Sequence, residues 1–584
     1  MRELTLLNTI HNAADVACLS ERELQMLSDE CRKYLIDTIL EHGGHFAGNL
    51  GVVELTVALL KVFNPHTDSV TWDVGHQSYA WKVLTGRREE ITTIRSYGGI
   101  AGFPKRGENP ADHFGTGHSS TAISAAMGIA VAAKLQNNNK STHIAIVGDG
   151  ALTGGMSFEA LNNAAASQAN LLIIINDNQI SIDAGTGAMN EHLATIKPGE
   201  TNIFSQLNLD YHGPVDGHDL PKLLDELTRL KSLEHPRVLH IKTIKGKGYG
   251  PAETEQTKWH STSRFVKIDA QKTTPARKWH EVAGDTMLKI ASTHHHTAGI
   301  TPAMPSGSGL IDCFKTYPSR FFDTGIAEQH AVTFAAGLAA GGIKPFLFIY
   351  STFLQRGYDQ VIHDIALQNL PVVICIDRAG LVGEDGPTHH GAFDIPMLRC
   401  IPGIKLLAPA TAEELQTMMH AAVQADYPIA IRYPKGPVPE LSIDTSSETP
   451  LENMGICLRK GEKVAVLSTG IATAMAHEAF QLTQSQASHY HFPVINHISD
   501  EMAVNIGKTH THIITVEDGA IAGGFGEAWS EKLYSLGFEG KVQHLGIPHQ
   551  FITHGSNDIL YNLGGYSPRK IAEELQKACS PVVD

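Results

Sequence analysis

The sequence predicts an α/β protein of three domains, each built on a mostly parallel sheet flanked by helices. Short β-branched runs alternate with helical patterns along almost all of the 584 residues. Each run is nearly continuously apolar, which is typical of strands buried on both faces of a parallel sheet. The clearest expected strands are residues 143–149, 170–177, 237–243, 344–350, 371–377, 428–433, 463–469 and 512–518.

Shifts in composition set the expected domain boundaries. Residues 258–301 contain no convincing strand and many polar side chains, so we expect a first domain over 1–270, a linker over 271–301 and a second domain over 302–440. A stretch rich in Pro, Ser and Thr follows, and a third domain is expected over 455–584. The expected linker contains three consecutive histidines, His294 to His296, which could bind a metal, although a solvated loop explains them better.

Composition narrows the class of protein. The chain has 46 Lys and Arg against 61 Asp and Glu, a formal charge of −15, and no basic stretch that would indicate a nucleic-acid partner. No apolar run approaches the ~20 residues that span a bilayer, and the first residues lack a secretory signal. Seven cysteines without CxxC spacing argue against a disulfide framework or a zinc site. We therefore expect a cytoplasmic protein.

The chemistry is expected at the carboxyl ends of the strands, where ligands bind in open parallel sheets. Asp149 lies in a Gly-Asp-Gly turn after one expected strand, and Asn178 follows the next strand. A carboxylate and an amide are oxygen ligands for Mg²⁺, and the glycines allow backbone N–H groups to approach a phosphate. An ordinary strand-to-helix turn is the alternative, but the placement of both residues at strand ends favours a Mg²⁺–diphosphate site. No GxxxxGK[ST] loop occurs.

Longer motifs resemble those of the 1-deoxy-D-xylulose-5-phosphate synthase family, which belongs to the transketolase-like thiamine diphosphate enzymes. The matching blocks are residues 45–59, 72–87, 102–120, 213–219, 321–339, 350–360 and 377–394. The resemblance implies a homodimeric enzyme that condenses pyruvate, with loss of CO₂, and D-glyceraldehyde 3-phosphate to 1-deoxy-D-xylulose 5-phosphate. In the family this product feeds isoprenoid, thiamine and pyridoxal synthesis.

The resemblance also implies which residues hold the cofactors, thiamine diphosphate and Mg²⁺. Asp149, Asn178 and the backbone carbonyl of Ile180 would bind the metal. Glu328 would hydrogen-bond the aminopyrimidine ring and promote loss of the thiazolium proton, while the cofactor supplies the carbanion and electron sink. The remaining residues of the cofactor pocket would be His76, Gly117, His118, Ser119, Gly150, Ala151 and Tyr249.

Substrate contacts follow from the same motifs. Arg378 and Arg432 would hold the phosphate of glyceraldehyde 3-phosphate, because a guanidinium donates paired hydrogen bonds, with Tyr350 and Arg356 nearby. The polar residues around the reacting carbon would be His45, His260, Asp385 and His389. A histidine is suited to proton transfer near neutral pH. Each histidine taken alone is better explained by a structural hydrogen bond, and His330 and His390 keep that explanation.

The chain departs from the family pattern in several places. Residues 181–207 are much shorter than the corresponding family segment, Lys435 replaces a usual Arg, and His390 replaces a usual Gln. These features suggest a divergent member, so a paralogue that uses another aldehyde acceptor is an alternative. A transketolase fits less well. A non-catalytic homologue is disfavoured because Asp149, Asn178 and Glu328 are all present.

Overall fold

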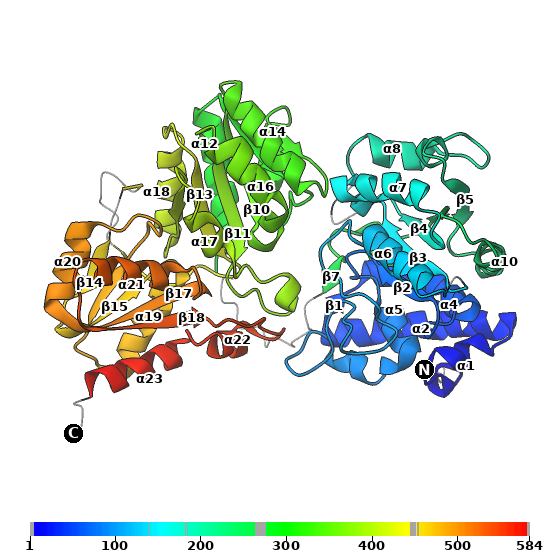
Figure 1. Cartoon of the computed structure of the whole chain (residues 1–584), viewed down its shortest axis with the longest axis horizontal. Helices are drawn as coiled ribbons and strands as arrows, with labels where there is room; N and C mark the ends of the chain where they lie inside the picture. Colours follow the sequence, from blue (N-terminus) through cyan, green and yellow to red (C-terminus); the bar gives the residue numbers. More distant parts are fainter. Residues whose placement is uncertain are drawn as a thin grey trace. The chain divides into compact units, whose positions relative to one another are not determined.

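A computed structural model describes residues 5–138, 140–180, 183, 185–262, 276–443, 451–452 and 455–580. The chain divides into two compact units, Met1–Gln271 with Gly325–Ala327 and Lys272–Thr324 with Glu328–Asp584. Figure 1 shows the strands and helices of both units. None of the described helices is long and apolar enough to cross a membrane.

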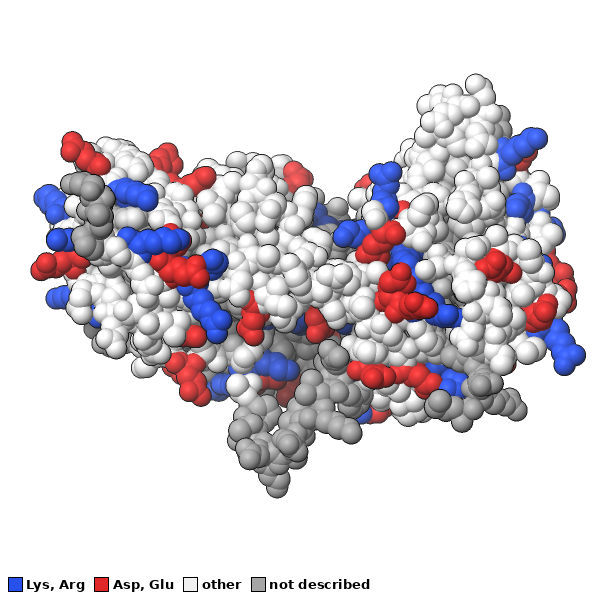
Figure 2. Space-filling view, turned by 90° about the horizontal axis from the view of Figure 1, so that it is seen from below, with Lys and Arg blue, Asp and Glu red and all other residues white. Residues whose placement is uncertain are grey.

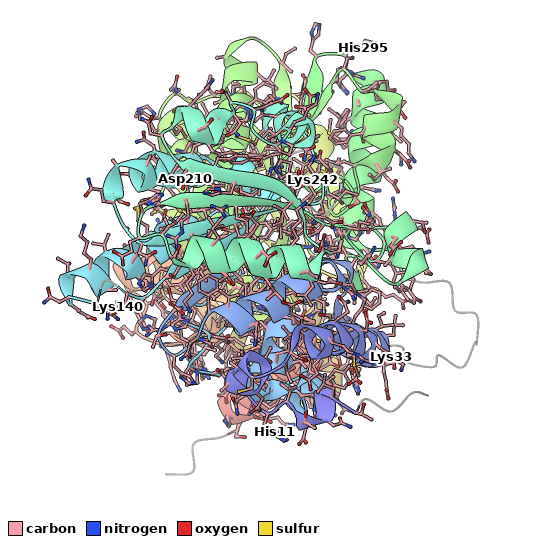
Figure 3. All side chains as sticks on the ribbon, turned by 90° about the vertical axis from the view of Figure 1, so that its right-hand side faces the viewer. His11, Lys33, Lys140, Asp210, Lys242 and His295 are labelled. Atoms are coloured by element: carbon pink, nitrogen blue, oxygen red, sulfur yellow. The ribbon has the colours of Figure 1, made fainter. Side chains whose placement is uncertain are left out.

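The first unit is built on a five-stranded parallel sheet. Its strand order is β2 (Ser69–Trp72), β3 (His143–Gly148), β4 (Leu171–Asp177), β6 (Arg237–Lys242) and β5 (Asp210–Asp216). Figure 3 labels Asp210 at the start of β5 and Lys242 at the end of β6, so the carboxyl ends of the strands lie on the Lys242 side.

Both faces of this sheet are covered, which explains the continuous apolar runs. Ile144 and Ile146 of β3 belong to one core, together with side chains of α2 (Glu21–His42) and α4 (Val53–Val62). Ala145 and Val147 belong to a second core, with α6 (Ala122–Leu135) and α7 (Gly155–Ser167). Successive side chains of a strand point to opposite faces, so a strand between two helix layers is apolar throughout.

The second unit contains two sheets. The larger is fully parallel and has the order β12 (Lys405–Leu407), β13 (Ile429–Pro434), β11 (Val373–Ala379), β10 (Lys344–Tyr350), β8 (Thr297–Thr301) and β9 (Phe321–Asp323). One core joins it to α12 (Trp279–Thr293), α13 (Ile311–Thr316) and α18 (Ala412–Ala422). Another joins it to α14 (Glu328–Ala340) and α17 (Asp394–Arg399).

The third sheet completes the second unit. Its order is β14 (Ile456–Arg459), β16 (Ser488–His491), β15 (Lys463–Ser468), β17 (His510–Ala520) and β18 (Lys541–Ile547). All of its strands are parallel except β14. The helices that pack with its side chains include α19 (Ile471–Thr483), α20 (Asp500–Thr509), α21 (Phe525–Ser535), α22 (Asn557–Leu563) and α23 (Pro568–Cys579). The predicted fold class, and each of the eight expected strands, are confirmed.

The expected linker over 271–301 is wrong where the structure describes it. From residue 279 it forms α12 and β8, and β8 pairs with both β10 and β9 inside the second sheet. The strand escaped detection because Ala298 and Gly299 are small. Gly299 is required there, because an added Cβ would lie 2.3 Å from the ring of Phe321. His294 ends α12, and its N–H donates to the carbonyl of Ile290.

Surface charge is mixed. On the face that Figure 2 shows, Lys and Arg side chains are interspersed with Asp and Glu side chains and form no broad basic patch among the coloured residues.

Candidate active site

The first part of the candidate site is the carboxyl edge of β3 and β4. Asp149 follows β3 directly and is 3% exposed. Its Oδ1 accepts the Gly150 N–H at 2.8 Å, whereas its buried Oδ2 has no hydrogen-bond partner within the described chain. Burial, and then the nearby Asp177 carboxylate, raise the pKa of Asp149 to about 6. A buried carboxylate oxygen without a donor fits a cation ligand.

Asn178 lies beside Asp149, because β3 and β4 run in parallel with Gly148 opposite Asn176. Its Oδ1 accepts the Ile180 N–H at 3.2 Å, so Asn178 and Ile180 belong to one tight turn. Asp149 N–H donates to the Asn176 carbonyl at 3.2 Å. Asp149 and the turn of Asn178 and Ile180 therefore lie at the same edge of the sheet, and carboxylate, amide and carbonyl oxygens are ligands that suit Mg²⁺.

Hydrogen bonds among buried side chains support the end of β4. Asp177 Oδ2 lies 3.0 Å from His240 Nε2, and His240 Nδ1 lies 2.7 Å from the Tyr211 hydroxyl. Thr243 donates to Asn176 Oδ1 at 2.6 Å on the other side. These contacts fix the backbone that carries the expected metal ligands.

Lys245 is a residue of this edge that the sequence reasoning missed. It is 2% exposed, and burial lowers its pKa to about 8 against the attraction of Asp149. Its position in the Gly-rich stretch 244–250, directly after β6, was the available signal. A buried lysine near Asp149 would supply positive charge to a diphosphate bound at the expected turn.

Three of the predicted histidines form one cluster. The ring centroids of His45 and His76 are 5.8 Å apart, those of His45 and His260 are 5.8 Å apart, and those of His76 and His260 are 5.3 Å apart. A short antiparallel pairing of β1 (Gly44–His45) with β7 (Ser261–Thr262) places His45 and His260 side by side. Burial, and then Lys245, lower the pKa of His76 to about 3, so its ring is neutral.

Asn49 positions two of these histidines and was also missed. Its Nδ2 donates to the carbonyl of His45 at 2.9 Å and to that of His76 at 2.8 Å. Its Oδ1 accepts the Tyr79 N–H at 2.7 Å. A buried amide that uses both ends in this way holds two separate motifs in one geometry.

The loop of Gly117, His118 and Ser119 is tied to the diphosphate turn through the next residue. The Ser120 hydroxyl donates to the Ala151 carbonyl at 2.8 Å, and the Ser119 and Ser120 hydroxyls are 3.1 Å apart. Asp73 accepts the Ser120 N–H at 2.7 Å and so fixes the loop.

Tyr249 lies against Phe46 and Trp259, with ring centroids 5.3 and 5.2 Å away. Trp259 directly precedes His260 of the histidine cluster. The aromatic group therefore links the Gly-rich stretch 244–250 to that cluster.

The second unit carries Glu328 at the start of α14. Glu328 is 3% exposed, and its Oε2 accepts no hydrogen bond from the residues described. Arg356 Nε lies 3.3 Å from that oxygen, so Arg356 is placed beside Glu328. Burial raises the pKa of Glu328 against the opposing charge of Arg356. A buried carboxyl whose pKa is raised, with one oxygen that accepts no hydrogen bond, suits a hydrogen bond to a ring nitrogen.

Tyr350, Arg378 and His389 come together at the ends of β10 and β11. The Arg378 guanidinium lies 3.8 Å from the Tyr350 ring centroid. Phe353 stacks on Tyr350 at 5.5 Å and contacts His389 edge-on at 5.6 Å. Burial acts to lower the pKa of Arg378, but Asp377 and, to a smaller extent, other groups that include Asp385 raise it on balance.

Arg378 has a backbone conformation unusual for an arginine, with φ of 58°. The register of β11 against β13 shifts at this point, which marks a β-bulge. Bulges next to sites re-aim a side chain. The guanidinium donates to the Gly307 carbonyl at 3.1 Å and also pairs with Asp377.

Arg432 was expected to bind the substrate phosphate, but two buried carboxylates hold its guanidinium. It is 2% exposed, and its guanidinium pairs with Asp394 at 3.0 Å and Asp518 at 2.5 Å. A contact with a substrate phosphate would require one of these buried ion pairs to open. Asp518 lies on β17, so Arg432 joins the second and third sheets.

His390 and His330 have the structural surroundings that were expected of them. His390 accepts from the Val382 N–H at 3.1 Å, and its Nε2 lies 3.0 Å from the Thr553 carbonyl. His330 is exposed and stacks on Phe334 at 5.7 Å. Lys435 donates to the Val382 carbonyl at 3.2 Å.

Comparison with known proteins first places the chain in the transketolase class. Residues 276–440 match the family model "Transketolase, pyrimidine binding domain", and residues 455–571 match "Transketolase, C-terminal domain". The model "1-deoxy-D-xylulose-5-phosphate synthase" matches residues 7–202 and 197–243.

Curated relatives then define the family. The 1-deoxy-D-xylulose-5-phosphate synthase of Cytophaga hutchinsonii is 43% identical over 634 residues, covering 99% of each chain. That of Albidiferax ferrireducens is 42% identical and covers 98% of this chain and 96% of its own. The chain therefore belongs to the 1-deoxy-D-xylulose-5-phosphate synthase family.

A solved transketolase from Campylobacter jejuni is 18% identical, with a TM-score of 0.45, and covers 96% of this chain and 100% of its own.

Alignment length bears on the shortened segment. The alignment with the Cytophaga relative is longer than the 584 residues of this chain, so that relative has residues which this chain lacks. The two pieces of the first family match meet at 197–202, inside the segment 181–207. Where it is described, that segment forms α8 (Ala188–Thr195) and α9 (Ile203–Gln206).

Proposed function

We propose that this chain is a thiamine diphosphate- and Mg²⁺-dependent 1-deoxy-D-xylulose-5-phosphate synthase. It condenses pyruvate, with loss of CO₂, with D-glyceraldehyde 3-phosphate to give 1-deoxy-D-xylulose 5-phosphate. The observation that carries the proposal is a buried acid at both expected cofactor positions, each with one carboxyl oxygen that accepts no hydrogen bond from the described residues: Asp149 Oδ2 in the first unit and Glu328 Oε2 in the second. Family membership over the whole chain supports the choice of substrates.

In the first unit, Asp149, Asn178 and the Ile180 carbonyl would hold Mg²⁺. Gly150, Ala151 and the residues 117–119 would line the diphosphate, with His76 beside it. Lys245 offsets the negative charge that gathers there. The neutral ring of His76 can donate one hydrogen bond to a phosphate oxygen without adding a buried charge.

In the second unit, Glu328 would hold a proton at the pyrimidine ring nitrogen, which its raised pKa favours. When bound, the cofactor supplies the carbanion and the electron sink for decarboxylation. Arg356 beside Glu328 keeps the carboxyl in place.

The substrates would meet two further sets of residues. Arg378 would bind the phosphate of glyceraldehyde 3-phosphate, with Tyr350 under its guanidinium. Carbon–carbon bond formation turns the aldehyde oxygen into a hydroxyl and therefore needs one proton. His45 and His260, or His389 with Asp385, would hold that proton near the oxygen. Arg432 would not contact the substrate directly and would support the site through its ion pairs with Asp394 and Asp518.

As the family resemblance implies, we also propose a cytoplasmic homodimer.

The test is a product assay with purified protein, thiamine diphosphate, Mg²⁺ and labelled pyruvate, with and without glyceraldehyde 3-phosphate. NMR should identify 1-deoxy-D-xylulose 5-phosphate, with CO₂ release that depends on the acceptor. Glu328→Gln should lower turnover by about 100-fold or more while cofactor binding is retained, and Glu413→Gln, an exposed acid on α18, is the matched control. Consumption of pyruvate without that product would reassign the acceptor.

A further inference from the structure

A pocket of about 540 Å³ opens where α17 ends. Its lining includes Arg399 and Cys400 at the end of α17, Lys405 of β12 and Tyr427 before β13, together with Asn496 and His497 from the loop after β16. The proposed function uses none of these residues. The volume is in the range of small-molecule sites.

The pocket is positively charged. Three of its lining residues, Arg399, Lys405 and His497, are basic, and none is acidic. No ion pair found in the described part of the chain includes any of the three. Arg399 and Lys405 are both half-buried. A half-buried cation without a counter-ion is costly, and an anionic ligand repays that cost.

Two of the basic groups, Arg399 and Lys405, have contacts that hold them in place before any ligand arrives. Arg399 Nε donates to the Gly523 carbonyl at 2.8 Å, which leaves the two terminal nitrogens of the guanidinium for a ligand. Lys405 Nζ lies 5.0 Å from the Tyr427 ring centroid. Asn496 Oδ1 accepts the Leu406 N–H at 3.0 Å, and its Nδ2 donates to the Ile404 carbonyl at 2.7 Å. These bonds fix this part of the pocket lining. Preorganised donors lower the entropic cost of binding.

We propose that this pocket binds a small molecule that carries a phosphate group. A phosphate brings more charge than a carboxylate and accepts the paired hydrogen bonds of a guanidinium, so it suits a pocket lined by Arg399, Lys405 and His497. The proposal does not depend on the catalysed reaction.

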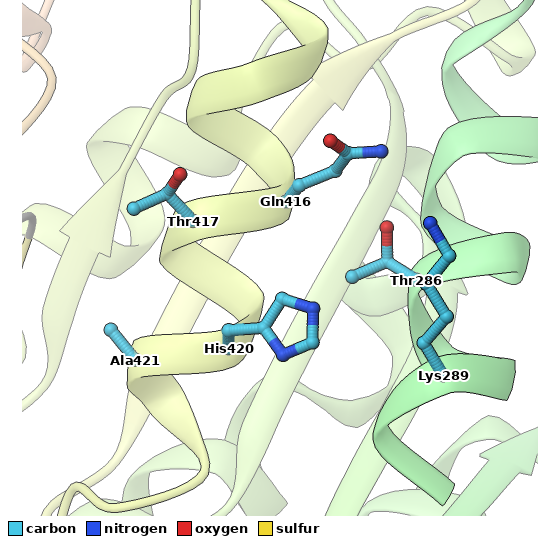
Figure 4. Close-up of a pocket in the computed structure, with 6 residues that line it drawn as sticks. All are labelled: Thr286, Lys289, Gln416, Thr417, His420 and Ala421. Carbon is cyan, nitrogen blue, oxygen red and sulfur yellow. The ribbon is translucent and has the colours of Figure 1, made fainter. Parts of the chain in front are cut away.

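A second pocket provides the matched control. It lies between α12 and α18 and is lined by polar residues that include Lys289 and His420. In Figure 4, Gln416 and His420 point from α18 toward the helix that carries Lys289. Lys289 and His420 are exposed, so water already solvates their charges and an anion gains less there. Lys289→Gln therefore removes a lysine of the same unit without touching the α17 pocket.

Cys400 offers a local measurement, because it lines the pocket and is exposed. The holoenzyme is alkylated with iodoacetamide in phosphate or in acetate at equal ionic strength, and each thiol is followed by peptide mass spectrometry. Phosphate should slow alkylation of Cys400 by about fivefold or more, because a bound anion disfavours the thiolate and blocks access. The exposed thiols Cys18, Cys457 and Cys579 are internal controls and should not change.

Arg399→Gln and Lys405→Gln should remove this protection, and Lys289→Gln should keep it. Equal slowing of all four thiols, or no effect of phosphate on Cys400, would overturn the proposal. Calorimetric titration with glycerol 1-phosphate gives a second readout that needs no thiol. Wild type and Lys289→Gln should show one binding site more than Lys405→Gln, and identical titrations would also overturn it.

Discussion

Replacement of Arg432 by Met should destabilise the second unit by about 3–5 kcal/mol. The guanidinium is 2% exposed, and it pairs with Asp394 at 3.0 Å and with Asp518 at 2.5 Å. Both carboxylates are themselves buried, at 1% and 2% exposure. Met fills much of the volume but leaves two buried negative charges without their cation. The loss of this buried cation accounts for the expected decrease in the free energy of unfolding.

Urea unfolding followed by tryptophan fluorescence measures the effect. Arg277→Met is the control, because Arg277 and Asp285 form an exposed ion pair whose loss should cost about 1 kcal/mol or less. Arg432→Lys keeps the charge and should lose less stability than Arg432→Met. Burial raises the pKa of Asp394 against the charge of Arg432, so Asp394 takes up a proton as the pH falls. The deficit of Arg432→Met should therefore be smaller at pH 5 than at pH 8.

A result in which Arg432→Met unfolds like the wild type, with only the KM for glyceraldehyde 3-phosphate raised, would refute this reasoning. It would make Arg432 a substrate ligand and not a link between two sheets.

Three other changes test the site and its support. Asp149→Asn should weaken Mg²⁺ binding about tenfold or more in calorimetric titration, because an amide brings no charge; unchanged affinity would place the metal elsewhere. Glu414→Gln should cost about 1–3 kcal/mol at pH 7. Burial acts to raise the pKa of Glu414, but the His491 ring at 3.2 Å and backbone N–H groups lower it on balance. The stabilisation is therefore present above the ordinary Glu pKa and lost below about pH 4, where the two unfolding curves should converge; a constant difference would contradict this. Tyr211→Phe removes the 2.7 Å contact with His240 and should cost about 1 kcal/mol and weaken Mg²⁺ binding. Unchanged Mg²⁺ affinity would limit that contact to stability.

The sequence predicts well what depends on local pattern. Asp149 and Asn178 could be placed together because each directly follows a buried apolar run, and parallel strands end at the same edge. The continuous apolar sequence of β3 correctly indicates that both of its faces are buried. β8 was missed because its local pattern is weak. It contains Ala298 and Gly299, and the ring of Phe321 leaves no room for a side chain at Gly299. Such small residues do not produce the apolar pattern of a strand.

Partners far apart in the chain could not be predicted. Arg432 and Asp518 are 86 residues apart, and no spacing rule connects them. Asn49 reads as a polar residue in a short helix, and only the fold shows that it holds both His45 and His76. The resemblance named the histidines but not the amide that sets their geometry.

Three of the expected cofactor residues share a physical feature that no motif shows. Asp149 Oδ2, His76 Nδ1 and Glu328 Oε2 are all buried without a hydrogen-bond partner in the described chain. Each such atom costs on the order of 1–3 kcal/mol, which a ligand that bonds it would recover. In the proposed function these residues would contact the metal, the diphosphate and the pyrimidine ring, respectively. Thiamine diphosphate with Mg²⁺ should therefore raise the thermal midpoint, because it satisfies atoms that the chain leaves unsatisfied.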